Sequence, residues 1–380
     1  MTTNRPLKKI EECLDKTSFF VWKIKTQDNL SEGKIPIIDQ WKELIAWYSN
    51  DESLVYDWKL PVIIYWDHTN IVKYVDFPFI CGADWTKVFK LKKDIDTKFF
   101  VYWLEHFKPE TQWYRRHYSL LKEIDFPLPP LATQKLIVAK LDETFAQIDE
   151  AITTTQANID KTDELTKSVL DKVFEEGEWE KKSVWNIANI KSWKRLPKGF
   201  RVQDEKTEYP YIRVSDFWED GTIDRSNIRY ITKEVFDQIS RYIITDKDLY
   251  ISIAGTIGKT WIIPSILNWA SLTENAIRLV YKDPEKIYNN YILYFTKSSS
   301  FIEQAWLATR AVAMPKLAIS RLEKIQIPLP SIAEQKEIVS YLDHVFAQSS
   351  QLKEQYQKKL VELKELKASV LQSAFEGKLV

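Results

Sequence analysis

Two long stretches of the chain place apolar residues three and four positions apart, the spacing that buries one face of an α-helix. The first series runs from Ile137 to Val169 and the second from Ile338 to Val370, and neither contains Pro or Gly. Each follows a PLP segment, whose prolines end a strand and do not fit inside a helix. The pattern predicts two long helices, which begin near Gln134 and Gln335.

The two stretches are copies of one another. The segment IDFPLPPLATQKLIVAKLDETFAQ from Ile124 aligns without a gap to IQIPLPSIAEQKEIVSYLDHVFAQ from Ile325, at a constant shift of 201 residues. About 22 of the 54 positions from Ile124 onward are identical, which indicates an internal duplication. A helix of about 43 residues would be a rod of roughly 65 Å. Thr155 and Ser349 interrupt the apolar seams, so we expect the two helices to pair with each other.

Residues 178–325 alternate short apolar runs with polar turns, a pattern typical of a mixed α+β domain. The predicted strands are YPYIRVSDF from Tyr209, DLYISIAGTIGKTWIIP from Asp248 and NAIRLVY from Asn275. YNNYILYF from Tyr288 and the run after Lys316 are predicted to be helical.

The first module has corresponding segments in the same order. They are GKIPIIDQW from Gly33, KLPVIIYWDHTNIVKY from Lys59 and WTKVFKLKKD from Trp85. The predicted fold class is therefore α+β, with two mixed α/β modules separated by two long helices. The predicted domains are residues 1–123, the central helical repeat 124–177, residues 178–325 and the C-terminal helical repeat 326–380.

The composition indicates a folded protein. In 380 residues, 44% are apolar and 13% aromatic, enough to fill several cores, and 8 Gly leave little room for flexible linkers. Cys13 and Cys81 cannot form a metal site by themselves, which favours free thiols in a reducing compartment. The start lacks the apolar core of a signal peptide, and no stretch approaches the roughly 20 apolar residues of a membrane span. We expect a cytoplasmic protein with no membrane association, metal or cofactor.

The net charge is zero, which by itself argues against a nucleic-acid partner. The charges are nevertheless segregated. Residues 178–325 carry 23 Lys and Arg against 18 Asp and Glu, residues 1–123 carry 19 against 18, and the remaining stretches carry 12 against 18. Positive charge therefore concentrates in the second module, and the acidic helices are expected to face something other than DNA.

The two helices could pair parallel or antiparallel. Two like halves are usually related by a two-fold axis. A parallel pair would bring both modules to one end, whereas an antiparallel pair would separate them. Only the antiparallel arrangement matches the dyad of duplex DNA, which runs across its axis, so we expect a pseudo-two-fold antiparallel arrangement.

Three segments together resemble the specificity subunit of type I restriction-modification systems. They are IPLPSIAEQKEIV, the closing LKASVLQSAFEGKLV, and AGTIGK followed about twenty residues later by ENAIRLV. The resemblance covers nearly the whole chain. It implies two target-recognition domains that read an asymmetric bipartite DNA site, two methyltransferase subunits and a motor-nuclease subunit as partners, and no catalysis by this chain. The first module departs from the pattern, because it shows DHTNIVK from Asp67 in place of the GTxGK turn.

The AGTIGK segment is not a nucleotide-binding P-loop, which needs four residues between its glycines where this segment has two. It predicts a turn between strands. Ser252, Thr256 and Lys259 could touch DNA there, since Gly permits close backbone approach and Lys neutralises phosphate. A purely structural hairpin is the alternative.

Other candidate DNA contacts are polar and basic residues near predicted turns. Arg213 could make the two-pronged contact to guanine, with Ser215 and Asp216 close to other base edges, although an internal ion pair of Arg213 fits equally well. Phosphate contacts are predicted for basic residues around an Ala-rich bend and for their counterparts in the first module: Arg310, Lys316, Arg321, Arg115 and Arg116. His68 and Asn70 are weaker candidates, and a solvated turn is the alternative for both.

Four of the residues that are identical in the two repeats are predicted to bind partner subunits. These pairs are Gln134 and Gln335, Leu141 and Leu342, Asp142 and Asp343, and Phe145 and Phe346. Solvated acidic helix faces are the alternative. No zinc-ligand spacing, nucleophile elbow or amino-methyltransferase motif occurs, so no catalytic residue is predicted. A structural scaffold and an independent nuclease or methyltransferase are the competing classes of function.

Overall fold

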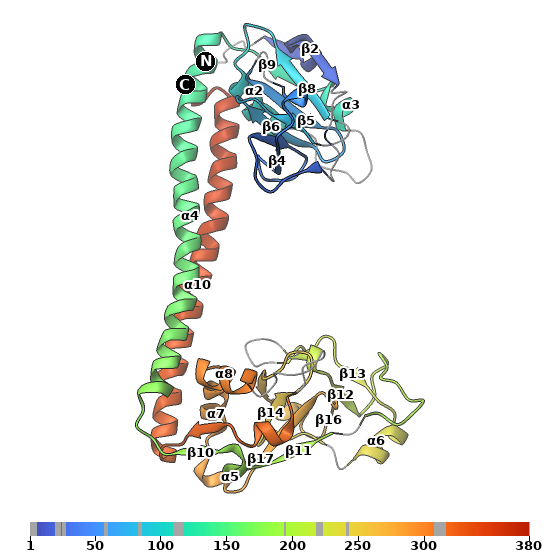
Figure 1. Ribbon diagram of the computed structural model, residues 1–380, viewed down its shortest axis with the longest axis vertical. Helices are drawn as coiled ribbons and strands as arrows, with labels where there is room; N and C mark the ends of the chain where they lie inside the picture. The colour runs from blue at the N-terminus through green and yellow to red at the C-terminus, as the bar shows by residue number, and fades with distance from the viewer. Residues whose placement is uncertain are drawn as a thin grey trace. The chain divides into compact units, whose positions relative to one another are not determined.

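The computed structural model describes residues 6–19, 24, 28–56, 60–82, 86–108, 117–193, 195–217, 223–240, 243–307 and 317–379. The chain forms two compact units. The first unit comprises Met1–Ala157 and Gln357–Val380, and the second comprises Asn158–Tyr356. Each unit therefore contains one globular domain and a part of both long helices (Figure 1).

The first domain is built on an antiparallel four-stranded sheet, β2(Leu14–Phe19), β8(Thr86–Leu91), β5(Val62–Trp66) and β6(Ile71–Val75), in that order. A three-stranded sheet has the order β4(Trp47–Ser49), β3(Ile35–Ile38), β7(Ile80–Cys81), and β1(Leu7–Lys9) pairs with β9(Asp125–Pro127). The helices are α1(Ile10–Cys13), η2(Glu52–Leu54), α2(Thr97–Phe107) and α3(His117–Leu121).

The second domain repeats this strand order. The four-stranded sheet has the order β11(Ala188–Ser192), β17(Ala276–Tyr281), β14(Leu249–Ser252), β15(Thr260–Ile262). The three-stranded sheet has the order β13(Arg229–Tyr230), β12(Pro210–Ile212), β16(Ser271–Leu272). β10(Lys181–Ser183) pairs with β18(Gln326–Pro328). The helices are α5(Val184–Ile187), η3(Val214–Asp216), α6(Lys233–Ile239), η4(Ser265–Leu267), η5(Pro284–Lys286), α7(Asn289–Phe295), α8(Ser299–Leu307) and α9(Ile319–Leu322).

The predicted correspondence between the two modules is confirmed strand by strand. β3 and β12 hold the middle of their three-stranded sheets, β5–β6 and β14–β15 are equivalent hairpins, and β8 and β17 are equivalent sheet strands. The YPYIRVSDF segment is a strand only over Pro210–Ile212, because the chain then turns into η3. Among the described residues of the first domain, α6 and α8 have no counterpart.

The long helices are α4(Leu131–Glu176) and α10(Ile332–Phe375), each beginning three residues before the predicted glutamine. In the first unit Lys367 Nζ lies 2.7 Å from Asp149 Oδ1. In the second unit Lys353 Nζ lies 2.6 Å from Asp163 Oδ1, and the Thr166 hydroxyl donates to Ser349 Oγ at 2.7 Å. In the second unit the residue numbers on α10 fall as those on α4 rise, which confirms antiparallel pairing.

Each four-stranded sheet is covered on both faces, so all five positions of β5 are buried. Successive side chains of a strand point to opposite faces. Accordingly Ile63 and Tyr65 join a core with Phe99 of α2 and residues of both long helices, while Ile64 and Trp66 join a separate core on the other face. The second unit repeats this division, since Leu249 and Ile251 face α4 and α10 whereas Tyr250 faces away. The helices are thus part of each domain's core.

Candidate nucleic-acid interface and partner surfaces

Ser252 makes three hydrogen bonds that close the turn between β14 and β15. Its backbone N–H donates to the Lys259 carbonyl at 2.8 Å, its carbonyl accepts from Gly258 N–H at 2.9 Å, and its hydroxyl donates to the Thr256 carbonyl. Ser252 is fully buried, whereas Thr256 and Lys259 are exposed. Gly258 has a φ of 83°, which favours glycine. Ser252 therefore stabilises the turn, and Thr256 and Lys259 are exposed on it.

Arg213 forms the internal ion pair that the sequence left open. Asp216, 1% exposed, accepts from the Arg213 backbone N–H at 2.8 Å and from Arg213 Nε at 3.0 Å. Arg213 Nη2 also donates to the Asn227 carbonyl at 3.0 Å. The Asp216 carboxylate is buried and occupied by Arg213, so its contact with a base edge stays a prediction. Ser215 is exposed beside them.

The equivalent turn of the first domain, between β5 and β6, also has one buried and one exposed candidate residue. Asn70 is 2% exposed, has a φ of 55° and accepts the Tyr65 hydroxyl at 2.9 Å, so it shapes the turn, while His68 is exposed. The turn is held by the chain that returns from residue 117, because the Asp67 carboxylate accepts from Tyr118 N–H at 2.7 Å.

The remaining basic candidates fall in two places. Arg321 is an exposed residue of α9. Arg115, Arg116, Arg310 and Lys316 lie outside the described residues.

Two of the four predicted partner-binding pairs are buried within their own units. Leu141 and Leu342 have no exposed surface and belong to the cores that join domain and helices. Gln134 and Gln335 are also fully buried. As long as this packing persists, none of the four side chains is accessible to a partner subunit.

The other two pairs form, in each unit, a cluster with a tyrosine from the domain, in which Phe145 is buried and the other members are at least partly exposed. Asp142 accepts the Tyr102 hydroxyl, and the rings of Tyr102 and Phe145 lie 5.4 Å apart. In the second unit Asp343 accepts the Tyr294 hydroxyl at 2.6 Å, and the rings of Tyr294 and Phe346 lie 5.2 Å apart. We call each set the Tyr-Asp-Phe cluster.

Burial, followed by the hydrogen bond to aspartate, raises the pKa of both cluster tyrosines, so each remains a protonated donor at neutral pH. Lys98 Nζ contacts Asp142 at 2.9 Å, and this contact raises the pKa of the lysine.

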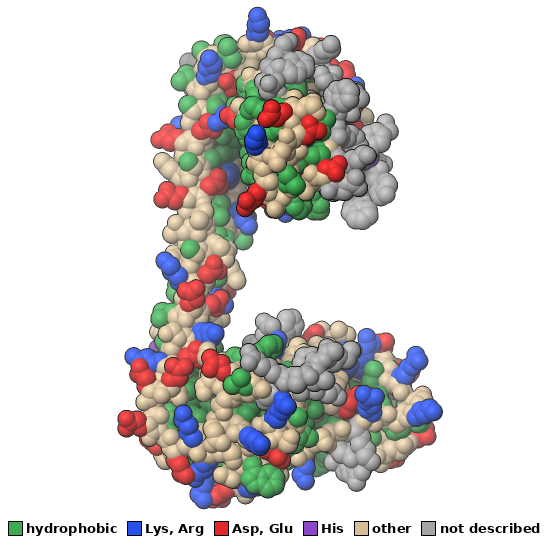
Figure 2. Space-filling view, in the orientation of Figure 1, with side chains coloured by type: hydrophobic (Ala, Val, Ile, Leu, Met, Phe, Trp, Pro, Cys, Tyr) green, Lys and Arg blue, Asp and Glu red, His purple; other side chains and the backbone are tan. Residues whose placement is uncertain are grey.

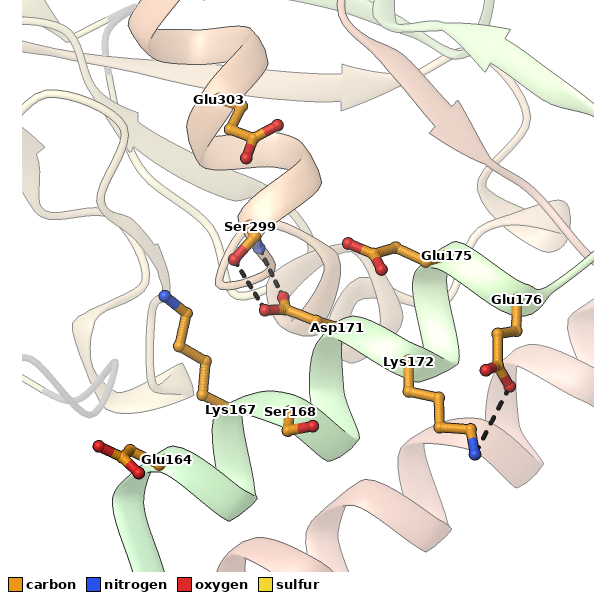
Figure 3. Close-up of a pocket in the computed structure, with 9 residues that line it drawn as sticks. All are labelled: Glu164, Lys167, Ser168, Asp171, Lys172, Glu175, Glu176, Ser299 and Glu303. Carbon is orange, nitrogen blue, oxygen red and sulfur yellow. Dashed lines mark hydrogen bonds and ion pairs between the residues drawn. The ribbon is translucent and has the colours of Figure 1, made fainter. Parts of the chain in front are cut away.

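Helix α8 is attached to α4 through one carboxylate. Asp171 accepts from the Ser299 backbone N–H at 2.6 Å and from its hydroxyl at 2.7 Å (Figure 3). The hollow of about 650 Å³ beside this contact is lined mostly by charged side chains, including Glu164, Lys167 and Glu303. Gln372 occupies the position of Asp171 in the other repeat.

A family model described as "Type I restriction modification DNA specificity domain" matches residues 3–161 and 176–362. This match covers most of the chain. The chain belongs to the type I restriction-modification DNA specificity family. The resemblance drawn from its motifs is thereby confirmed.

Two specificity subunits of Escherichia coli are similar to this family member. The EcoBI subunit is 31% identical over 290 residues, which cover 68% of this chain and 59% of that subunit, less than two thirds of its length. The EcoR124I/EcoR124II subunit is 28% identical over 361 residues, 89% of this chain and 85% of that subunit.

Solved structures share the fold at lower identity. A chain from a study of complex assembly and conformational transition of the type I R-M system is 17% identical, with a TM-score of 0.78 over 100% of this chain and 99% of that chain. The HsdS subunit from Thermoanaerobacter tengcongensis is also 17% identical, with a TM-score of 0.57 over 99% of this chain and 97% of that one. These likenesses confirm the predicted fold class.

Sequence reasoning missed several functional candidates of this specificity-family chain. Lys206 and Arg225 line a surface hollow of about 570 Å³ in the second domain together with Ile266. Figure 2 shows Lys and Arg side chains gathered at the end of that domain which carries β13 and α6. The excess of basic residues in 178–325 was the available signal. Tyr102 and Tyr294 were missed because they lie outside the helical repeat.

A third hollow, of about 540 Å³, lies between the β14–β15 turn and α8 and is lined by Lys259, Phe301 and Trp306. Within the described ranges, no helix is long and apolar enough to cross a membrane, and no group of three or more His, Cys, Asp and Glu is placed to hold a metal ion. Cys13 and Cys81 are buried and are not joined by a disulfide.

Proposed function

We propose that this chain is the DNA sequence-recognition subunit of a type I restriction-modification complex. Each globular domain reads one part of an asymmetric bipartite target, and the chain carries out no catalysis itself. The observation that supports this most strongly is the duplication. Two domains with the same strand order are each built onto the antiparallel helices, while their exposed turns differ in sequence. Two readers of different half-sites require that combination.

The proposed DNA contacts of the second domain are exposed polar and basic side chains. Lys259 and Thr256 present a cation and a hydroxyl from the β14–β15 turn, and Ser215 and Arg321 are exposed on η3 and α9. In the first domain, His68 on the equivalent turn is the proposed contact. Arg115, Arg116, Arg310 and Lys316 remain proposals based on sequence. Phosphate contacts would position the domain and base contacts would give specificity.

The proposed partners are two methyltransferase subunits and a motor-nuclease subunit. A partner that binds twice requires two equivalent surfaces, and the Tyr-Asp-Phe clusters supply a repeated one with the same chemistry in both units. Each cluster places a partly exposed tyrosine beside a carboxylate, a composition suited to a protein interface with a polar rim.

The proposal is tested by exchanging the second domain. β10 and β18 pair in antiparallel register, with Lys181 opposite Pro328, so the two ends of the domain are hydrogen-bonded neighbours and a graft of 181–328 preserves the junction. With the graft from another family member, co-expressed methyltransferase should modify a target in which one half is new and the other unchanged. Methylation at the original sites, or a change in both halves, would contradict the proposal.

A single-residue test uses Lys259. The Lys259→Ala variant should weaken DNA binding about equally across sequences and reduce the slope of log affinity against log salt by about one. The matched control is Lys172→Ala on α4, where the lysine pairs with Glu176 at 3.7 Å (Figure 3). An unchanged salt slope in Lys259→Ala would exclude a phosphate contact at this turn.

A further inference from the structure

A fully buried glutamine lies at the fourth residue of each long helix and joins three segments of its unit. In the first unit, Gln134 Oε1 accepts from the Asp96 backbone N–H at 2.7 Å. Gln134 Nε2 donates to the carbonyls of Asp94, at 2.9 Å, and Pro129, at 2.8 Å. The side-chain amide thus uses its acceptor and both of its donor hydrogens.

The second unit repeats the arrangement bond for bond. Gln335 Oε1 accepts from the Tyr288 backbone N–H at 2.8 Å, and its Nε2 donates to the carbonyls of Lys286 and Pro330, both at 2.9 Å. The loops that receive these bonds differ, with the sequence DID at 94–96 and KIY at 286–288. All six bonds go to backbone atoms, so the geometry is kept while the loop sequence varies.

The segments joined in this way are those that set a domain on its helix. The loop at Asp94–Asp96 leads directly into α2, whose first turn is capped by Asp96, and the Lys286–Tyr288 loop leads into α7. Pro129 and Pro330 belong to the extended segments that enter α4 and α10. Each glutamine therefore bonds the start of a domain helix to the start of a long helix.

Apart from the Tyr-Asp-Phe clusters, the Lys98–Asp142 pair and the Ser299–Asp171 contact, the remaining contacts between domain and helix are mostly apolar. Phe99 and Phe100 of α2 pack with Ile137 and Leu141 of α4 in one core. Burial of apolar surface is non-directional, so it resists separation more than rotation or sliding. Hydrogen bonds weaken steeply as their angle departs from linearity. Three such bonds on one planar amide therefore restrict the angle between domain and helix.

We infer that Gln134 and Gln335 are positioning residues which fix the orientation of each globular domain on its long helix, and so set the spacing between half-sites that the chain accepts. This inference rests on the proposed function as a reader of a bipartite target. Gln134 and Gln335, which are fully buried, would thus determine how accurately the chain selects the distance between half-sites, and they would contact neither DNA nor a partner subunit.

The test measures spacer discrimination by the full chain in complex with its methyltransferase subunits. Affinity is compared for the mapped target and for targets with a spacer one base pair longer or shorter. Gln335→Leu keeps a similar volume but removes all three bonds, and Gln355→Leu, at an exposed position of α10, is the matched control. We expect the preference for the native spacer to fall about tenfold in Gln335→Leu, and the control to keep the wild-type preference.

A common loss of affinity on all spacers, with the preference unchanged, would overturn the inference and leave only a structural role. Should Gln335→Leu not fold, Gln335→Glu retains the acceptor for Tyr288 and is measured in the same way. Amide hydrogen exchange of the wild-type chain gives a further check. If the backbone amides of Asp96 and Tyr288 exchange as fast as those of exposed loops, their hydrogen bonds to Gln134 and Gln335 are refuted. A wild-type complex that shows no DNA sequence preference would refute the proposed function. The spacing role of the glutamines would then fail as well, even if slow exchange of both amides showed that the hydrogen bonds exist.

Discussion

The pairing of Arg213 with Asp216 yields a quantitative prediction for the Asp216→Ala variant. The carboxylate is 1% exposed and accepts from the backbone N–H of Arg213 and from two guanidinium nitrogens. Its removal leaves the Arg213 N–H without its acceptor, and it leaves the guanidinium, whose side chain is 29% exposed, without its counter-charge. Breaking a buried pair typically costs about 3 to 5 kcal/mol, and partial exposure of the arginine reduces this to about 2 to 3 kcal/mol.

The assay is urea unfolding of the full chain, with amide exchange in β14 and β17 used to assign the transition to the second unit. Asp237→Ala is the matched control, because Asp237 and Lys233 form a solvent-exposed pair on α6 at 3.2 Å, and exposed pairs contribute little to stability. Arg213→Ala should destabilise the same unit, since it leaves a carboxylate buried without its counter-charge. Wild-type stability in Asp216→Ala would refute the reasoning. Loss of one half-site's specificity in a fully stable Arg213→Ala variant would show that Arg213 reads DNA.

Three further predictions concern individual groups. Asp171→Ala should destabilise α8 by about 1 kcal/mol and speed its amide exchange, whereas Gln372→Ala, at the equivalent position, should leave exchange unchanged. Burial raises the pKa of Tyr211 to about 12. Because the pKa of Tyr211 in the folded chain lies above the unfolded pKa of about 10, the protonated hydroxyl contributes stability below pH 10, and this contribution is lost as pH rises toward 12. Tyr211→Phe should therefore flatten the fall in the urea midpoint between pH 10 and pH 12. Burial raises the pKa of Cys13 to about 11, so its alkylation at pH 8 should be slow in the native chain and fast in urea, and equal rates would contradict the buried site.

Those features that depend on the duplication were predictable from sequence. The shared spacing of apolar residues gave both long helices, and the order of apolar runs gave the equivalence of β5–β6 with β14–β15. Antiparallel pairing also followed, although the argument for it used the symmetry of DNA and not the helix seams. The contacts that establish it, such as Asp149 with Lys367, lie far apart in sequence and carry no local signal.

The roles of single polar residues were less predictable, because sequence shows which residues recur but not what packs against them. Gln134 recurs as Gln335 and was expected at a partner surface, yet both amides are enclosed by loops that precede α2 and α7. Asp216 is adjacent to an exposed serine, but its position at the end of η3 turns the carboxylate back onto Arg213. Burial of a polar side chain depends on tertiary contacts, which a repeat at a shift of 201 residues does not reveal.

The two units differ where a reader of two sequences would have to differ. The residues that join domain to helix are the same in both units. Gln134 and Gln335 form corresponding hydrogen bonds, and so do the two Tyr-Asp-Phe clusters. The exposed turns differ, because Thr256 and Lys259 of the second unit face solvent where the first unit presents His68. Selection on two different half-sites would produce that pattern, and the graft of 181–328 tests it directly, because it replaces the turns of the second domain while Gln134 and Gln335 remain.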